Sequence, residues 1–268
     1  MEQDFTKGLT VCIGNYGYYN EGELHDAWIT LPKTEAEIRD FLHLNHLQDS
    51  QHEEIYISDY DGIPFGTRLL FNEFCHLEDL NLLAKQVKTP ADQKLYSKSI
   101  YGIEKKQLPY LLCITNMLLH DIDNPQVFHD NSLEHDVRDY RHKEDGQFDV
   151  VLMNPPYGGS EKASIQNNFP TALRSSETAD LFLALILYRL KKNGRAAVII
   201  PDGFLFGQDA AKIEIKRQLI EEFNLHTVVR MPQSVFAPYT SITTNILFFD
   251  NTKKSEGVWF CRMDMPEG

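Results

Sequence analysis

The chain has 268 residues, of which 42% are hydrophobic and 24% are charged, the composition of a folded protein. These values exclude a largely disordered, collagen-like or mucin-like chain. The first residues, MEQDFTKG, contain two acids and no apolar stretch, which excludes a signal peptide. The longest uninterrupted apolar run covers eight residues, 181–188, whereas a membrane-spanning helix needs roughly 20. We therefore expect a cytoplasmic protein with no membrane partner.

Cysteine and histidine patterns predict no metal site. The four cysteines lie far apart, at Cys12, Cys75, Cys113 and Cys261. They form no C-x-x-C pair and no zinc spacing, so we expect reduced thiols. Three histidines, His43, His46 and His52, lie close together in the sequence, but no set of cysteine or acidic ligands is spaced to match them.

The formal net charge of −13 is spread unevenly along the chain. Residues 1–88 contain 16 acidic and 6 basic side chains, whereas residues 89–268 contain 23 and 20. A chain with this excess of acids does not bind DNA through its average field, so any DNA contact is local or is supplied by a basic partner. The alternative interpretation of the acidity is that it keeps the protein soluble.

Apolar patterns predict a small α+β unit at the N-terminus. Runs of β-branched and apolar residues predict strands, and apolar residues at helical spacing predict helices. The expected elements are a strand at 9–15, a strand at 26–31, a helix at 34–42, a strand at 54–60 and a helix at 76–87. The polar stretch that follows, residues 88–98, contains Pro90 and is the best candidate for a linker.

Strands and helices alternate in the rest of the chain. The expected elements are a strand at 100–104, a helix at 106–120, a strand or loop at 127–133, a strand at 148–153, a helix at 179–192, a strand at 195–200, a helix at 209–223 and a strand at 225–230. Gly194 is expected to cap the helix that precedes it. The last two strands, 243–250 and 257–262, are expected to pair antiparallel. This alternation predicts a doubly wound α/β sheet.

The strongest local signal is the tetrapeptide Asn154-Pro155-Pro156-Tyr157, which directly follows the predicted strand FDVVLM. Its two prolines end the strand and stiffen the turn, because neither can donate a ladder hydrogen bond. They would hold Asn154 and Tyr157 at the carboxyl end of a parallel strand, where open α/β sheets bind ligands.

This placement suits methyl transfer to an exocyclic amino group. That reaction needs the amine lone pair freed from the ring and directed at a methyl donor. The amide oxygen of Asn154 and the backbone carbonyl of Pro155 can accept the two amino protons, and Tyr157 can stack on a base swung out of the duplex. Acceptors that bind the amine more tightly as positive charge develops lower the barrier. The alternative is a proline-stiffened turn with no binding role.

Five ordered segments carry a resemblance to a known family: FDVVLMNPPYGGSE, QNNFP, ETADLFL, GRAAVIIPDGFLFG and LHTVVRMPQSVFAPYTSITTNILFFD. From about residue 83 to the last residue, the chain resembles the modification (M) subunit of type I restriction–modification systems. Members of that family are adenine-specific DNA methyltransferases that use S-adenosylmethionine. The resemblance implies a Rossmann-like methyltransferase sheet, this cofactor, and a catalytic role for residues 154–157.

The resemblance also implies two cofactor-binding residues. Glu104, directly after its strand, matches the acid that holds the cofactor ribose, and Asn131 matches the polar residue beside the cofactor adenine. A carboxylate at the end of a strand is independently suited to bond a ribose diol. The alternatives are a surface acid for Glu104 and an Asx turn for Asn131.

A glycine-rich segment of the family, of the type D-P-A-C-G-T-G-G-F, has no match upstream of Leu83. In the family it forms the first strand and the loop that cradles the methionine part of the cofactor, so S-adenosylmethionine binding by this chain stays open. The first strand lies beside the strands that precede Glu104 and Asn154. We therefore expect an incomplete sheet, first strand missing, with two open edges. A second chain or the N-terminal unit fills the gap, or nothing does and the product is poorly stable. The family's N-terminal helical region and its C-terminal continuation are expected to lie outside this chain.

Residues 9–82 have a second resemblance. The segments CIGNYGYYNEGELHDAWITLP, HLNHLQDSQHEEIYISDYDGIPF and EDLNLLA are similar to the first part of ArdA-type antirestriction proteins, which are acidic mimics of DNA that bind type I restriction enzymes. The carboxylates that could replace phosphates are Glu21, Glu23, Asp26, Glu35, Glu37, Asp40, Glu53, Glu54, Asp59 and Asp61. The alternative is a solvated acidic domain with no mimic role. The predicted domains are an acidic ArdA-like unit at 1–82, a junction at 83–98, and a partial catalytic domain at 99–268.

The sequence leaves three functions open. The first is an adenine-specific modification subunit, incomplete on its own, that works with other restriction–modification subunits. Its DNA would be read through a separate specificity subunit, and a fragment would supply the missing strand. The second is a catalytically inactive chimera that acts as a DNA-mimic antirestriction decoy. The third is a truncated remnant.

Overall fold

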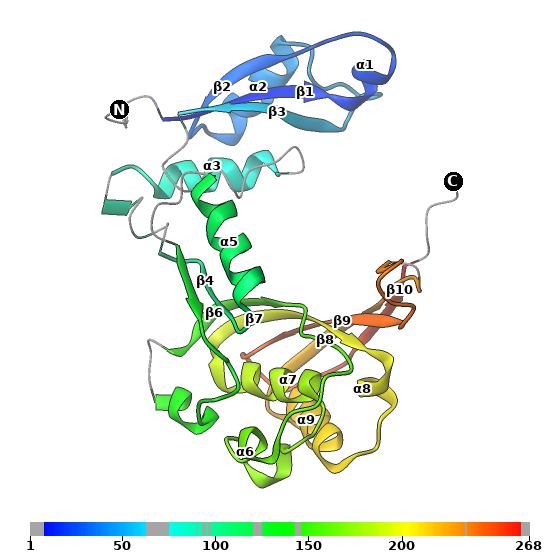
Figure 1. The fold of residues 1–268 in the computed structure, drawn as a ribbon. Helices are drawn as coiled ribbons and strands as arrows, with labels where there is room; N and C mark the ends of the chain where they lie inside the picture. Colours follow the sequence, from blue (N-terminus) through cyan, green and yellow to red (C-terminus); the bar gives the residue numbers. More distant parts are fainter. Residues whose placement is uncertain are drawn as a thin grey trace. The chain divides into compact units, whose positions relative to one another are not determined.

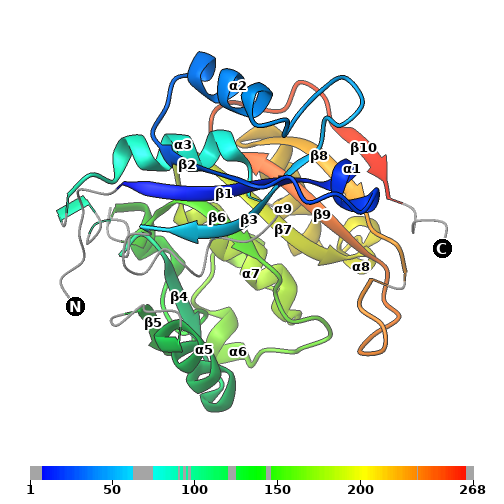
Figure 2. The same cartoon turned by 90° about the horizontal axis from the view of Figure 1, so that it is seen from above.

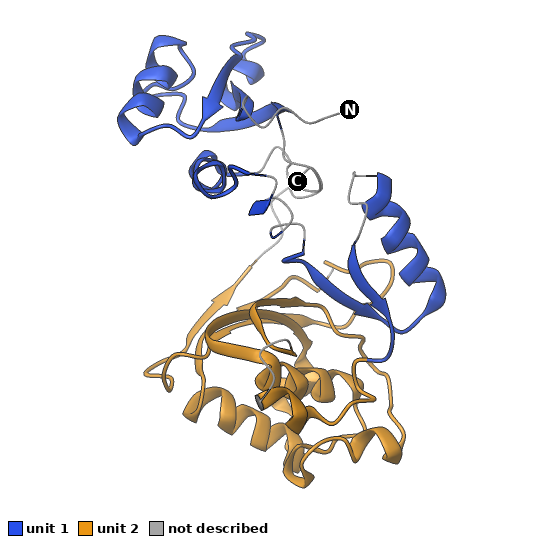
Figure 3. Cartoon of the chain, turned by 90° about the vertical axis from the view of Figure 1, so that its left-hand side faces the viewer, with its two compact units in different colours: residues 1–131 blue, residues 132–268 orange. Residues whose placement is uncertain are grey.

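The computed structural model describes residues 8–62, 75–89, 91–92, 95, 98–119, 125–142, 146–233 and 235–263. The chain divides into two compact units, residues 1–131 and 132–268, which have separate colours in Figure 3. Part of the predicted linker at 88–98 lies outside the described residues. None of the helices in the described ranges is both long enough and apolar enough to cross a bilayer.

An antiparallel sheet of three strands begins the first unit (Figure 2). The strands are β1 (Leu9–Asn15), β2 (Ala27–Leu31) and β3 (Ile55–Asp61), in the order β2-β1-β3. All three were expected from the sequence. A short helix, α1 (Tyr16–Asn20), follows β1 because the buried side chain of Asn15 accepts a hydrogen bond from the backbone N–H of Gly17 at 2.8 Å.

Helix α2 (Glu35–Leu44) starts where the sequence predicts a helix. Thr34 and Glu37 form a capping box, in which each side chain accepts a hydrogen bond from the other residue's backbone N–H. Leu42 is buried against the sheet, and Ile38 and Phe41 pack beside it. The apolar stripe that predicted the helix is therefore the face that it buries.

Helix α3 (Leu77–Gln86) completes the same core. Leu77, Leu80 and Ala84 are buried in one cluster with residues of β1 and β2. The side chain of Asn81, which is 5% exposed, accepts a hydrogen bond from Lys33 N at 2.7 Å and donates one to Lys33 O at 2.8 Å. The proposed boundary at residue 82 therefore falls inside a helix that packs on the N-terminal sheet.

Replacing Asn81 with alanine is expected to lower the free energy of unfolding of this part of the chain by about 1–3 kcal/mol, because Lys33 loses partners for both backbone groups. Denaturant unfolding, followed by the fluorescence of Trp28 in β2, measures the change in the free energy of unfolding. Trp259 is replaced by phenylalanine in all variants, so that Trp28 is the only tryptophan. The control is Asn45→Ala, which removes one exposed hydrogen bond to Phe41 O and should change stability by no more than about 0.5 kcal/mol. Equal effects of the two variants would contradict the role given to Asn81.

The first unit also contains a small parallel sheet. Strand β4 (Tyr101–Glu104) pairs with β5 (Gln126–His129), and Glu104 lies opposite His129. Helix α5 (Gln107–Leu119) follows β4, and none of its residues is buried.

The second unit contains a mixed five-stranded sheet in the order β10-β8-β9-β7-β6. Its strands are β6 (Phe148–Met153), β7 (Leu190–Pro201), β8 (Asn224–Arg230), β9 (Thr244–Asp250) and β10 (Trp259–Arg262). Its helices are α6 (Ala163–Gln166), α7 (Thr178–Arg189), α8 (Asp202–Phe206) and α9 (Ala210–Glu221), with 3₁₀ turns at Val137–His142 and Thr171–Leu173. Strands β6 and β7 are parallel, and β9 runs antiparallel to both of its neighbours.

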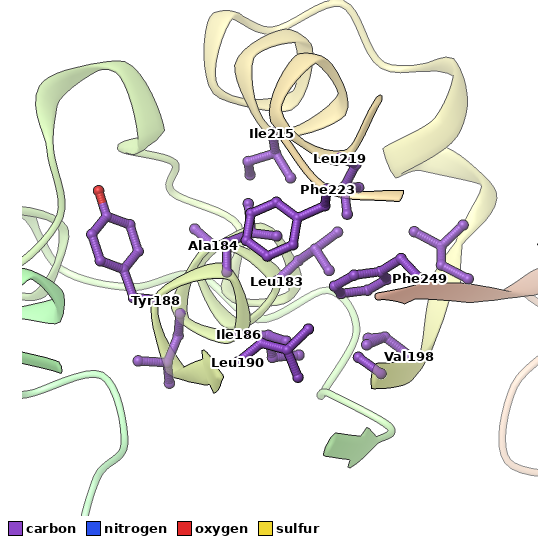
Figure 4. Close-up of a cluster of buried hydrophobic side chains, with 14 of the residues drawn as sticks. Leu183, Ala184, Ile186, Tyr188, Leu190, Val198, Ile215, Leu219, Phe223 and Phe249 are labelled. Carbon is purple, nitrogen blue, oxygen red and sulfur yellow. The ribbon is translucent and has the colours of Figure 1, made fainter. Parts of the chain in front are cut away.

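The core of the second unit forms where α7 and α9 pack on one face of this sheet (Figures 1 and 4). Leu183 and Ile186 of α7 are buried at its centre, and Ile215 and Leu219 of α9 pack nearby. Helix α7 is buried on nearly all sides, which explains why its sequence is an uninterrupted apolar run and not an amphipathic stripe.

Two predictions about this unit were wrong. Helix α7 ends at Arg189, and the chain passes directly into β7, so Gly194 lies inside a strand and does not cap the helix. Between Arg189 and Gly194, the residue with positive φ is Asn193, at 65°. A Cβ atom at Gly194 would lie 3.0 Å from Asp149 O and 2.9 Å from Lys191 O, so glycine is needed there for close backbone approach.

The second error concerns the last two strands, which do not form an antiparallel pair. Strand β9 lies between β7 and β8, and β10 pairs in parallel with the other side of β8. Ser255 explains the path of the chain between them: its N–H donates to Ile220 O at 2.8 Å, and its hydroxyl donates to Leu225 O at 3.0 Å. These contacts hold the connection against the end of α9 and the start of β8, and β9 has no free edge with which β10 could form a hairpin.

Strands β4 and β6 each have an open edge among the described residues. Strand β4 pairs only with β5, and β6 pairs only with β7. These are the strands expected to flank the missing first strand. Leu152 of β6 is 78% exposed and Val150 is 49% exposed, although the sequence of β6 has the continuous apolar character of a strand that is buried on both faces.

Candidate active site

The Asn-Pro-Pro-Tyr turn, residues 154–157, lies at the carboxyl end of β6, as predicted. Asn154 follows the last strand residue and is exposed, whereas Pro155 is buried and anchors the turn. Tyr157 is half-buried, and its hydroxyl donates a hydrogen bond to the amide oxygen Oδ1 of Asn154. Burial raises the pKa of Tyr157, so the phenol remains a donor. The structure thus brings the two predicted functional side chains together.

The segment after Tyr157 is tied to the start of α7. Thr178 N donates to Gly159 O at 3.0 Å, and Glu161 N donates to Ser176 O at 2.9 Å. A Cβ atom on Gly159 would lie 2.6 Å from Thr178 Oγ1, so only glycine allows this approach. These contacts fix the downstream end of the Asn-Pro-Pro-Tyr turn.

A buried lysine supports this arrangement from α9. Lys212 Nζ lies 2.9 Å from Asp180, 3.0 Å from Glu177 and 3.1 Å from Asp209. The side chains of Lys212 and Asp180 are 3% and 0% exposed. Although burial disfavours its charge, the surrounding carboxylates raise the pKa of Lys212 above its ordinary value. Sequence reasoning missed this residue; the available signal was a lysine on the apolar face of a predicted helix.

A second aromatic ring faces Tyr157. Phe236, from the connection between β8 and β9, has its ring centroid 6.3 Å from that of Tyr157, at an interplanar angle of 62°. This edge-on geometry is typical of interacting aromatic pairs. Phe236 was not predicted as a site residue, although it lies inside one of the segments that carried the family resemblance.

The two predicted cofactor residues lie together in the first unit. Glu104 ends β4, and its carboxylate accepts a hydrogen bond from Lys106 N at 2.6 Å. Asn131 follows β5 by two residues and is 7% exposed. Asp130 N donates to Glu104 O at 3.3 Å, which joins the two strand ends. Glu104 and Asn131 thus belong to one unit and residues 154–157 to the other.

The ten predicted mimic carboxylates of the N-terminal segment are all exposed. Nearby, His52 Nδ1 lies 3.0 Å from Asp49 Oδ1, and His52 Nε2 lies 3.2 Å from Glu21 Oε1. The ring of Tyr18 stacks on His52 with centroids 4.0 Å apart, and its hydroxyl donates to Asp49 at 2.8 Å. The described residues contain no group of three or more His, Cys, Asp or Glu side chains that could hold a metal ion.

The His52 cluster predicts that the first unit is more stable near pH 6 than near pH 9. Hydrogen bonds to Asp49, and then to Glu21, raise the pKa of His52 above its ordinary value of about 6.5. Protonation of His52 is therefore favoured in the folded state. The stability that His52 adds is complete below about pH 6.5 and is lost as the pH rises through the raised pKa. Melting temperatures from pH 6 to 9 should fall less steeply for His52→Gln than for the wild type, whereas His43→Gln, at an exposed position, should behave like the wild type. Parallel curves for wild type and His52→Gln would contradict this prediction.

Comparison with known proteins identifies the family. Residues 78–266 match the family model described as N-6 DNA Methylase. The chain belongs to this family. The match includes α3, Glu104 and the Asn-Pro-Pro-Tyr turn, so it spans parts of both units.

Relatives within the N-6 DNA methylase family confirm the resemblance to type I modification subunits. The chain is 50% identical over 196 residues to the type I restriction enzyme EcoEI methylase subunit of Escherichia coli, with 73% of this chain and 38% of the relative covered. A crystal structure of a modification subunit from Vibrio vulnificus YJ016, described as part of a type I restriction enzyme, has a TM-score of 0.63 and 42% identity over 71% of this chain and 41% of that chain. The chain therefore spans about two fifths of the length of these relatives.

The predicted fold is confirmed as well. A protein of Listeria monocytogenes described as a class I S-adenosylmethionine-dependent methyltransferase has the same fold, with a TM-score of 0.50 at 16% identity, over 62% of this chain and 49% of that chain. Residues 11–139 also match the family model described as Antirestriction protein (ArdA). This match supports the resemblance predicted for residues 9–82, and it overlaps the methylase match from residue 78 onward.

Proposed function

We propose that this chain provides the base-binding part of an adenine-specific DNA methyltransferase, as a modification subunit of a type I restriction–modification system. The observation that carries the proposal is the pairing of Asn154 and Tyr157 at the carboxyl end of β6, opposite the ring of Phe236. A polar acceptor bonded to one aromatic side chain, with a second ring next to the first, suits a flipped adenine, which needs stacking on its faces and acceptors for its amino group.

The side chains of the turn have distinct roles in this proposal. Asn154 Oδ1 accepts a hydrogen bond from Tyr157 in the present structure, and the adenine amino group takes the place of that donor. The backbone carbonyl of Pro155 accepts the second amino proton. Both acceptors bind more strongly as the nitrogen becomes positive, which lowers the barrier to transfer. Tyr157 and Phe236 hold the base and exclude water from it.

The cofactor fits part of the chain. S-Adenosylmethionine would supply the methyl group when bound. The carboxylate of Glu104 at the end of β4 suits the ribose hydroxyls, and the buried Asn131 beside it suits the adenine ring. No glycine-rich loop that would hold the methionine part precedes β4 in the sequence. The first strand that this loop would follow is also missing from the described sheets.

The partners follow from these features. We propose that a separate specificity subunit reads the DNA, that other restriction–modification subunits complete the assembly, and that a polypeptide fragment supplies the missing first strand. The complex would work in the cytoplasm. A domain boundary near residue 98 is part of the same proposal.

Methyl transfer in a reconstituted complex tests the proposed function. The chain would be combined with the EcoEI specificity subunit and with a fragment of the EcoEI methylase subunit that precedes the matched region. We expect transfer of radiolabelled methyl groups to adenine in this mixture and none from the chain alone. Failure of the assembled complex to methylate DNA would count against the proposal.

A second function has its own support. The exposed carboxylates and the ArdA match favour an inactive chimera that binds a restriction–modification complex in place of DNA. Salt-dependent capture of a whole modification complex by the purified chain, together with no methyl transfer, would favour this decoy. Absence of both activities would favour a remnant without function.

A further inference from the structure

One carboxylate joins three strand ends at the carboxyl edge of the five-stranded sheet. Asp202 directly follows β7, and both of its oxygens accept hydrogen bonds from Arg230, at 3.1 and 2.8 Å. Its Oδ1 also accepts from Asn245 Nδ2 at 2.7 Å. Arg230 is the last residue of β8, and Asn245 is the second residue of β9 and 1% exposed. Asp202 therefore links the end of β8 to the start of β9, and Phe236 lies in the connection between these two strands.

Backbone bonds at the same place involve the same residues. Asp202 N donates to Thr243 O at 3.1 Å, and Met231 N donates to Thr244 O at 3.0 Å. The connection between these points, residues 231–243, is mostly exposed where it is described, and Tyr239 is 93% exposed. Because few of its side chains pack against the core, the position of Phe236 depends mainly on how the two ends of the connection are held.

We propose that Asp202 is a positioning residue that sets the separation of Phe236 and Tyr157, and thus the space for the base. This inference rests on the proposed function only for the identity of the occupant. Paired hydrogen bonds between a guanidinium and a carboxylate are strong and fix geometry. Asparagine at position 202 has one acceptor oxygen and an NH₂ group that faces the donors of Arg230, so it cannot hold both strands in the same way.

The chain offers a matched control at the opposite end of the same two strands. Asp250, the last residue of β9, accepts a hydrogen bond from Asn224 Nδ2, at the start of β8, at 2.9 Å. Asp250→Asn also weakens a carboxylate link between β8 and β9, but it does so away from the aromatic pair.

Fluorine NMR of the full chain labelled with 3-fluorotyrosine tests the proposal. The chain has 12 tyrosines, and Tyr157→Phe identifies the resonance of Tyr157. In Phe236→Ala that resonance should move, because the facing ring is lost. Asp202→Asn should move it in the same direction, whereas Asp250→Asn should leave it in place even if its melting temperature falls. The proposal would be overturned if both aspartate variants, or neither of them, displaced the Tyr157 resonance. It would also be overturned if Phe236→Ala left that resonance unchanged.

If Asp202→Asn does not fold, Arg230→Lys replaces it, because lysine keeps the charge and loses the paired geometry. It should displace the Tyr157 resonance in the same direction, and an unchanged resonance would overturn the proposal. The measurement needs neither DNA nor cofactor. A displaced resonance in a chain whose complex fails to methylate DNA would support the role of Asp202 and reject only the proposed activity.

Discussion

Lys212→Met is expected to lower the free energy of unfolding of the second unit by about 3–5 kcal/mol, the usual result of removing one member of a buried ion pair. Methionine has a similar length, so packing is retained and the loss is mainly electrostatic. Asp180, which is fully buried, would keep the hydroxyl of Ser175 as a partner and lose its cation. It would then bind a proton more readily in the folded state than in the unfolded state, so the loss should be smaller at pH 4 than at pH 7.

The matched control is Lys191→Met. Lys191 Nζ lies 2.8 Å from Asp149 Oδ2, but the two side chains are 37% and 80% exposed, so the cost should be about 0–1 kcal/mol. The double variant Lys212→Met/Asp180→Leu should recover part of the lost stability, because it no longer buries an unpaired carboxylate. Denaturant unfolding of the full chain gives all three values. Equal losses for Lys212→Met and Lys191→Met would show that the buried network does not support the second unit.

Local patterns predicted much of the fold because the relevant interactions are local in sequence. The capping pair Thr34 and Glu37 and the apolar stripe behind it specify α2 within a dozen residues. The Asn-Pro-Pro-Tyr turn was placed correctly for the same reason: two prolines end a strand wherever that strand lies. Strand β6 and helix α7 were also found from their apolar residues. Helix α7 is buried, as such a run predicts, whereas only Val151 of β6 is buried.

Features that depend on contacts distant in sequence were not predicted. Strand β10 pairs with β8 and not with β9 because both edges of β9 are already paired, with β7 and with β8. The carboxylates around Lys212 come from two separate helix starts. The ring that faces Tyr157 is supplied by Phe236, from a connection almost 80 residues later. Composition and periodicity carry no information on such pairings.

Two features of the fold indicate that this chain does not form a complete methyltransferase domain by itself. Helix α3 belongs to the segment that matches the methylase family, yet its apolar face completes the core of the N-terminal sheet, and Asn81 bonds the backbone of Lys33. Strands β4 and β6 lack neighbours on one side among the described residues. Helix α3 packs in the N-terminal core, and β4 and β6 each have an open edge. In the proposed function, the chain depends on a partner because of these two features.

Asn154→Ala is expected to lower kcat for adenine methylation about 10²–10³-fold in the reconstituted complex, the usual effect of removing one preorganised group that stabilises developing charge. The value of KM for DNA should change little, because the lost acceptor acts mainly in the transition state. Asn154→Asp keeps an acceptor oxygen and should retain more activity than Asn154→Ala. Asn167→Ala, at an exposed position in the same unit, should leave both kinetic constants unchanged.

The outcome also decides between the functions that the chain could have. Full methylation with Asn154→Ala would show that the acceptor for the adenine amino group comes from another polypeptide in the complex, so this chain would be a decoy or a remnant. Loss of methylation with normal assembly of the complex would place the chemical step at the carboxyl end of β6. In that case the open edge of β6 would be the place where the partner's first strand pairs, because the residues that end a strand are positioned by the strands paired on either side of it.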